Sequence, residues 1–178
     1  DCLYKNPTLI PKKVKGTSEE KTQLKWLMKY KNGYANRPSV RISGPMGTIS
    51  DTAIREIIQS RLPHLSEHNL EEINSAHRLS MSAENILGPF LEEYLSNTLA
   101  EFNWHCAWGE VIRYVDFCNE DGRLLQVKNR DNSENSSSKE VRNNTSILLW
   151  FRVFNRTGRY NWDALNDLNQ TKKFSEEG

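Results

Sequence analysis

The chain has 178 residues, of which 37% are hydrophobic and 26% are charged, and its formal net charge is +1. This length and apolar content allow one folded core and exclude a disordered chain, and the small net charge excludes a histone-like coat of positive charge. A nuclease stays possible, because acidic metal ligands offset a basic groove. The three cysteines show no CxxC spacing, which predicts a protein of the reducing cytoplasm without a disulfide framework or a zinc site. The sequence also has no long apolar run, so no membrane span is expected.

The first part of the chain predicts helices separated by turns. A helix begins after Ser18 with an apolar face of Leu24, Leu27 and Met28, and Asn32-Gly33 is expected to end it. Asp51 caps a second helix that Pro63 stops, and a third is expected from Ser66. The last two helices could form a helix-turn-helix motif. Paired amphipathic helices more commonly pack as part of the hydrophobic core, without a binding role.

The strongest helical pattern covers residues 82–102, where Ser82 is the expected cap and Gly88-Pro89 predicts a kink or a fresh start. Two strand-like runs follow at 108–118 and 122–130, and the Asp-Gly pair between them predicts a hairpin. Residues 147–154 predict a third strand and residues 161–168 a short helix. We therefore expect an α/β (α+β) fold in a single domain of residues 1–178, with a helical N-terminal part (about 1–80) and a core (about 81–170).

Polar side chains interrupt the apolar strands of this hairpin. Gln126 and Lys128 point to the same face of one strand, and the turn places Asp116 beside Gln126 within about one residue pair. A hard divalent cation prefers this set of oxygens, including a backbone carbonyl such as that of Val127, and Lys128 suits the orientation of a water or the stabilisation of phosphorane charge. The alternative is a sheet whose polar face simply meets solvent.

The helix before the hairpin supplies a second acid. Packed on the sheet, it brings Glu92 to the same metal and adds the negative charge that Gln126 lacks. Glu84 and Glu93 are rival positions, because facing changes by about 100° per helical residue.

The chain resembles the PD-(D/E)xK nucleases in the order of three features. A helix with the pattern GxxLE comes first, Asp116 follows, and a polar residue then stands two positions before Lys128. The resemblance implies a restriction-endonuclease-like core with a mixed central sheet flanked by helices, Mg²⁺ as cofactor, and hydrolysis of phosphodiesters. It implies metal binding by Asp116, Gln126, Val127 and Glu92, with Lys128 as the catalytic lysine. Gln126 departs from the family pattern, which has an acid there.

A narrower resemblance covers most of residues 82–168. The stretches KNRDNSENSSSKEVR and ILLWFRVFNRTGRYNW are similar to the type II restriction endonucleases of the SinI kind. This implies a prokaryotic restriction-modification enzyme that acts as a homodimer on double-stranded DNA, at a short near-palindromic site such as GGWCC, without a nucleotide cofactor.

The polar tract after the second hairpin strand is the expected DNA-reading element. Its amide, hydroxyl and basic side chains suit contacts with base edges and phosphates, whereas the alternative is an ordinary surface loop. The candidate DNA-binding residues are Asn129, Arg130, Asn132, Ser133, Asn135, Ser136, Ser137, Lys139 and Arg142. Other functions that stay open are a structure-selective or repair nuclease on the same core and a non-catalytic DNA-binding module, for which Gln126 is the best argument.

Overall fold

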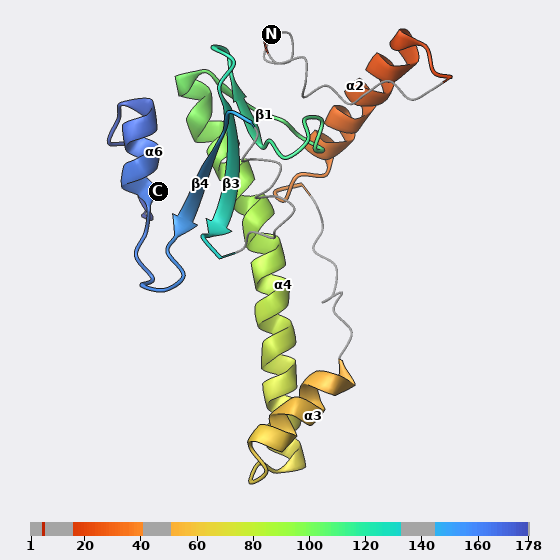
Figure 1. Ribbon diagram of the computed structural model, residues 1–178, viewed down its shortest axis with the longest axis vertical. Helices are drawn as coiled ribbons and strands as arrows, with labels where there is room; N and C mark the ends of the chain where they lie inside the picture. The colour runs from red at the N-terminus through yellow and green to blue at the C-terminus, as the bar shows by residue number, and fades with distance from the viewer. Residues whose placement is uncertain (1–4, 6–15, 41–50, 133–144, 178) are drawn as a thin grey trace.

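The computed structural model describes residues 5, 16–40, 51–132 and 145–177. Its centre is a four-stranded sheet in the order β1-β2-β3-β4 (Figure 1). The strands are β1 (Trp104–Cys106), β2 (Phe117–Asn119), β3 (Leu124–Arg130) and β4 (Ile147–Val153). The first three pair antiparallel and β3 pairs with β4 in parallel. This mixed sheet, with helices packed against it, confirms the predicted fold class and is consistent with a restriction-endonuclease-like core.

The hairpin between β2 and β3 forms where the sequence predicts it. The N–H of Asn119 donates to the carbonyl of Arg123 at 2.8 Å, and the Asn119 side chain accepts from the N–H of Asp121 at 2.9 Å. Gly122 takes a φ of +87°, which a glycine adopts without steric cost. This turn fixes the register in which Phe117 lies opposite Leu125.

Most of the strand predicted at 108–118 is not a strand, because only Phe117 and Cys118 of that range belong to β2. Gly109, Glu110 and Tyr114 have positive φ values of 72°, 54° and 61°, which no extended strand can contain. Their neighbours Val111, Ile112 and Val115 are nevertheless buried. The apolar run therefore marks a tightly turned segment that fills the core, and β1 was missed altogether.

The expected third and fourth helices are a single helix, α4 (Glu67–Thr98). Ser66 caps it by accepting from the N–H of Asn69, so the prediction of a new start at Ser82 is wrong. Pro89 lies inside the helix without ending it, although its missing N–H costs the helix one backbone hydrogen bond. Figure 1 shows α4 crossing the sheet and continuing beyond it as an arm that carries α3 (Thr52–Arg61) at its far end.

The two N-terminal helices contribute little to the core. α2 (Glu19–Ala35) runs past Asn32-Gly33, and its predicted apolar face of Leu24, Leu27 and Met28 is exposed. α3 begins after the predicted Asp51 cap, but none of its residues is fully buried, so it is not the plain core expected. An ion pair between Arg55 and Glu67 joins it to the start of α4.

The hydrophobic core lies on both faces of β3. On one face Leu125 and Val127 pack against Leu91 and Leu95 of α4, and this cluster extends to η2 (Leu99–Phe102) and α6 (Trp162–Asn169). On the other face Leu124 and Ile147 cover the turned segment. Within the described residues no helix has the length and apolarity that a membrane crossing requires.

Gly33 lies close against the backbone of the turned segment, and this contact gives a prediction about stability. A Cβ at Gly33 would lie 2.6 Å from the Cα of Gly109, whereas a Cβ at Gly88 would meet nothing within 4 Å. Alanine gains about 1 kcal/mol of helix propensity at either position, but the overpacking at Gly33 costs about 1–3 kcal/mol. We expect Gly33→Ala to lower the melting temperature and Gly88→Ala to raise it. Equal melting temperatures for the two variants would contradict the close approach.

Candidate active site

Asp116 lies at the point where β2 separates from β3. Its own N–H donates to the carbonyl of Leu125 at 3.0 Å, and its carboxylate Oδ2 accepts from the N–H of Val127 at 2.7 Å. The carboxylate thus takes the place that a backbone carbonyl of the neighbouring strand would fill in a continuing ladder. Extending the register of Phe117 opposite Leu125 by one step puts Asp116 across from Gln126, within the predicted distance.

The same geometry orients the carbonyl of Val127. In a strand the N–H and C=O of one residue point to the same side, and the Val127 N–H points to Asp116. The Val127 carbonyl therefore also faces the opening between the two strands. A carboxylate and a neutral oxygen meet there.

Glu92 is brought to this place by α4. It follows Leu91, which is buried against the sheet, and is itself partly buried. Burial raises the pKa of Glu92 from 4.5 to about 7; the negative charges of Asp116 and Glu110 raise it and the Lys128 ammonium lowers it. Glu92 is therefore within electrostatic reach of Asp116 and Lys128.

The rival acids of the helix have other surroundings. Glu84 is exposed on the arm. Glu93 is buried on the far side of α4, where its carboxylate accepts from the N–H of Ser39 at 2.8 Å and pairs with Arg37. Of the three candidates, only Glu92 shares the environment of Asp116.

The two acids form a desolvated pair. Burial raises the pKa of Asp116 as well; the hydrogen bond from Val127 and the charge of Lys128 lower it, and Glu110 raises it. Two partly buried carboxylates beside a carbonyl oxygen fit a hard cation, whose charge would offset their repulsion. Within the described residues no three acidic, histidine or cysteine side chains lie close enough to hold a metal ion. A metal here would need the neutral oxygens to complete its ligands.

Gln126 and Lys128 alternate with the core residues Leu125 and Val127 along β3. Gln126 is only 4% exposed, so the alternative in which it meets solvent is wrong. Lys128 is partly exposed at the end of the buried stretch. An ammonium group thus lies at the boundary between the acid pair and solvent.

Two neighbours of the acids were missed by sequence reasoning. Cys106 is buried at the end of β1, and its thiol pKa is raised by burial and by the charges of Glu92 and Asp116. Glu110 acts on both acids from the turned segment, where its φ is 54°. No local sequence pattern marks either residue as part of the site. Each is brought there by turns of the chain that the neighbouring residues do not predict.

The DNA-reading tract is described only at its start. The Asn129 side chain accepts from Arg152 at 3.0 Å, and an Arg130 guanidinium nitrogen lies 3.4 Å from the side-chain oxygen of Asn155. Asn132 is exposed. The first residues of the tract are therefore tied to β4 and the turn after it. The remaining candidates, Ser133, Asn135, Ser136, Ser137, Lys139 and Arg142, lie outside the described residues.

A mixed sheet with two desolvated carboxylates and a lysine where two strands part is typical of the PD-(D/E)xK class. The family model described as SinI restriction endonuclease matches residues 5–178, and the chain belongs to this family. It is 41% identical over 138 residues to type II restriction enzyme Eco47I of Escherichia coli and 39% identical over 138 residues to type II restriction enzyme SinI of Salmonella infantis. Each match covers 75% of this chain, and the chain spans 60% of the length of each relative.

The raised pKa of Glu92 predicts how stability depends on pH in the absence of metal. Between pH 4.5 and about 7 the folded protein keeps a proton that the unfolded chain releases. The free energy of unfolding therefore falls as the pH rises through this window, and the contribution of protonated Glu92 is lost above about pH 7. We expect Glu92→Gln to flatten the dependence and to melt several degrees higher than wild type at pH 8. Glu84→Gln is the control, and a wild-type slope in the Glu92 variant would contradict the assignment.

Proposed function

We propose that the chain is part of a Mg²⁺-dependent, site-specific endonuclease that hydrolyses double-stranded DNA in a restriction-modification system. The observation that carries the proposal is the partly buried pair of Asp116 and Glu92, with Lys128 within electrostatic reach, at the separation of β2 and β3. Membership of the SinI restriction endonuclease family supports it. The names of both relatives, type II restriction enzymes, agree with it.

Asp116 and Glu92 would hold the metal, together with the Val127 carbonyl and the Gln126 side chain. Bound there, Mg²⁺ supplies charge stabilisation for a phosphoryl group and lowers the pKa of water. Asp116 is pre-oriented by the Val127 N–H, so little reorganisation is needed when it binds a cation.

Lys128 acts on the phosphate. Its ammonium donates to a non-bridging oxygen or to the attacking water, and so stabilises the negative charge that develops at phosphorus. The water oxygen forms a new bond to phosphorus and releases a proton to solvent, while the bond to one strand oxygen breaks and the leaving oxygen takes up a proton from solvent. Burial of the acid pair strengthens each of these interactions, because the local dielectric is low.

Gln126 replaces the acid that usually precedes the catalytic lysine by two positions. Gln126 is buried and lies across from Asp116 in the extended register, which supports its amide oxygen as a ligand that adds no charge. The site then depends on Asp116 and Glu92 for all its negative charge. This makes Glu92 more important here than in a site with a third acid.

Sequence recognition would come from the tract that follows β3. β3 continues through Arg130, two residues after Lys128, so one continuous stretch of chain would carry both the residue that acts on the phosphate and the residues that contact the bases. We propose a short near-palindromic target, with GGWCC as the sequence that the family resemblance implies.

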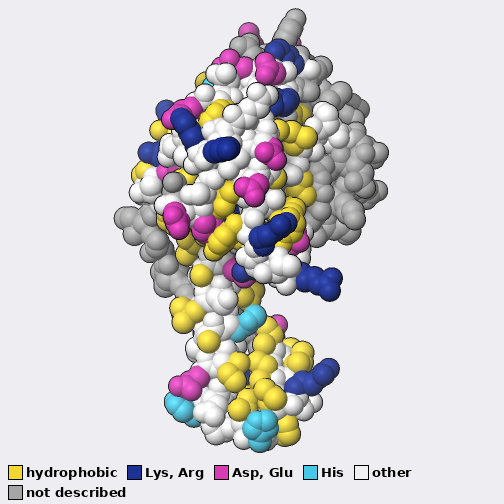
Figure 2. All heavy atoms as spheres, turned by 90° about the vertical axis from the view of Figure 1, so that its left-hand side faces the viewer, with side chains coloured by type: hydrophobic (Ala, Val, Ile, Leu, Met, Phe, Trp, Pro, Cys, Tyr) yellow, Lys and Arg dark blue, Asp and Glu magenta, His cyan; other side chains and the backbone are white. Residues whose placement is uncertain are grey.

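We further propose that the enzyme acts as a homodimer through the arm of α4. Exposed apolar residues recur there at spacings of three and four, and they do not face the sheet: Ala76, Leu79, Ala83, Ile86 and Phe90. Leu79, Ile86 and Phe90 are 56%, 44% and 46% exposed. Such a stripe matches a second copy of itself, and Figure 2 shows further hydrophobic side chains gathered over the lower end of the arm. A two-fold dimer suits a near-palindromic site.

A plasmid digest with Mg²⁺ tests the nuclease. Wild type is expected to give discrete fragments, Asp116→Ala and Glu92→Ala to cut at least about 100-fold more slowly, and Glu84→Ala to cut as wild type does. Cutting of branched DNA alone would favour a structure-selective nuclease. Binding in a gel shift without any cutting by wild type would favour a non-catalytic module and contradict the proposal.

Sedimentation velocity tests the dimer. The double variant Leu79→Glu/Ile86→Glu is expected to be monomeric at concentrations where wild type is dimeric, because it buries four charges in the contact. Asn85→Glu, at another exposed position of the arm, is the control and should stay dimeric. A double variant that remains dimeric would place the contact elsewhere.

A further inference from the structure

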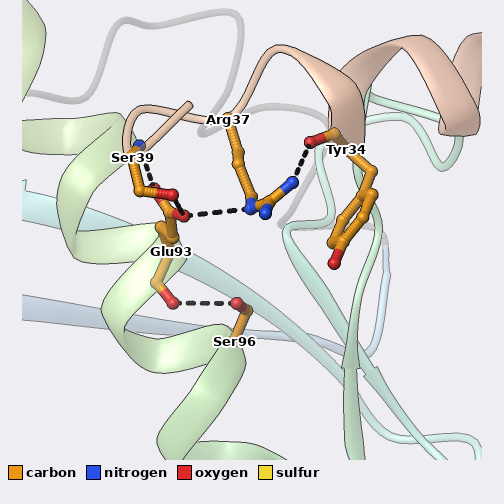
Figure 3. A network of polar contacts seen from close by, with 5 residues as sticks. All are labelled: Tyr34, Arg37, Ser39, Glu93 and Ser96. Atoms are coloured by element: carbon orange, nitrogen blue, oxygen red, sulfur yellow. Dashed lines mark hydrogen bonds and ion pairs between the residues drawn. The ribbon is translucent and has the colours of Figure 1, made fainter. Parts of the chain in front are cut away.

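Glu93 is buried although it lies on the side of α4 that faces away from the sheet. Two residues after Leu91, it is rotated by about 200° from the core-facing side. The segment after α2 covers it: the Ser39 N–H donates to its carboxylate at 2.8 Å, the Ser39 hydroxyl donates to the other oxygen, and Arg37 Nε lies 3.2 Å away (Figure 3). Only 8% of Glu93 is exposed. The helix is therefore held on two opposite sides at this turn.

Arg37 is itself fixed from α2. A terminal nitrogen of its guanidinium donates to the Tyr34 carbonyl at 3.0 Å, and the group lies 4.3 Å from the centre of the Tyr34 ring. The Tyr34 ring meets Trp108 edge-on, with 6.0 Å between the ring centres. The same few residues thus touch both α4 and the segment that leads to Asp116.

The end of α2 also touches the backbone of that segment. Gly33 lies against Gly109, and the Lys29 ammonium donates to the carbonyl of Glu110 at 2.9 Å. At the start of the same segment, the N–H of Ala107 donates to the carbonyl of Asp116 at 2.7 Å. The end of α2 is thereby joined to both chain segments that carry the candidate acids.

Apolar packing alone would not fix the direction of Glu92. The contacts of Leu91, Leu95 and Leu99 with the core hold α4 on the sheet, but the hydrophobic effect has no preferred direction. Hydrogen bonds do have one. The bonds that Glu93 accepts resist rotation of α4 about its axis, which would otherwise relieve the repulsion between Glu92 and Asp116.

We propose that Arg37 and Ser39 are positioning residues for the candidate active site: by holding Glu93, they fix the rotation of α4 that directs Glu92 at Asp116. This proposal rests on the nuclease function proposed above for its effect on activity, but not for its effect on the position of Glu92. A displacement of about 1 Å at a reacting centre costs up to about 100-fold in rate.

Two measurements on four variants test it. Ser39→Ala and Glu93→Gln remove part of the contact, Ser39→Thr restores the hydroxyl, and Glu84→Gln makes the same charge change at an exposed position of the same helix. The ¹³C signal of the Glu92 carboxyl reports its surroundings without any need for activity. Single-turnover cleavage at saturating DNA, compared with DNA affinity, reports the functional effect.

The expected result is a shifted Glu92 signal and roughly 10- to 100-fold slower cleavage in Ser39→Ala and Glu93→Gln, with DNA affinity unchanged. Ser39→Thr should regain most of the rate and Glu84→Gln should match wild type. An unshifted Glu92 signal in both contact variants overturns the positioning role, as does a Ser39→Thr variant as slow as Ser39→Ala. A wild type that cuts no DNA defeats the proposed function alone, and the Glu92 signal then decides the positioning role by itself.

Discussion

The hydrogen bond from the Val127 N–H to the Asp116 carboxylate is the interaction around which the candidate site is built. It forms where β2 separates from β3, and it satisfies a strand N–H that would otherwise lose its partner. Because the acceptor is a side chain and not a backbone carbonyl, the ladder ends in a charged group. A structural requirement of the sheet therefore places a carboxylate, and the carbonyl of Val127 points to the same side of the strand as the N–H that binds it.

The same arrangement carries an electrostatic cost that the protein meets in several ways. Asp116 and Glu92 are both desolvated and repel each other, and Lys128 offsets only part of this. The apolar core supplies no attraction between two like charges, and directed contacts from Arg37 and Ser39, just after α2, hold the outer side of α4 through Glu93. The N-terminal helix, which buries no residue of its own, is thus tied to the site more closely than to the core.

Local signals in the sequence predicted the parts of this structure that local chemistry determines. The Asp-Gly turn set the register of β2 and β3, so the neighbourhood of Asp116 and Gln126 could be predicted from the spacing along two strands. Ser82 and Pro89 misled because α4 already begins at the Ser66 cap and continues through both. The left-handed Glu110 and Tyr114, and the contact between Ser39 and Glu93 across 54 positions of the chain, have no local signal at all. The roles of the site residues and of the polar tract remain predictions.

The parallel pairing of β3 and β4 has a consequence for how such a protein can change. Leu124 pairs with Ile147, so the chain that leaves β3 at Arg130 must return along about 20 Å of strand before β4 begins. A tight turn cannot make that connection, and some crossover segment is obligatory whatever its composition. Residues 131–146 can therefore vary in length and content without shifting the register of the strands that carry Gln126 and Lys128. Under the proposed function, target choice would lie in this connection and bond cleavage in the strands, so that mutation could alter the first while the second stays intact.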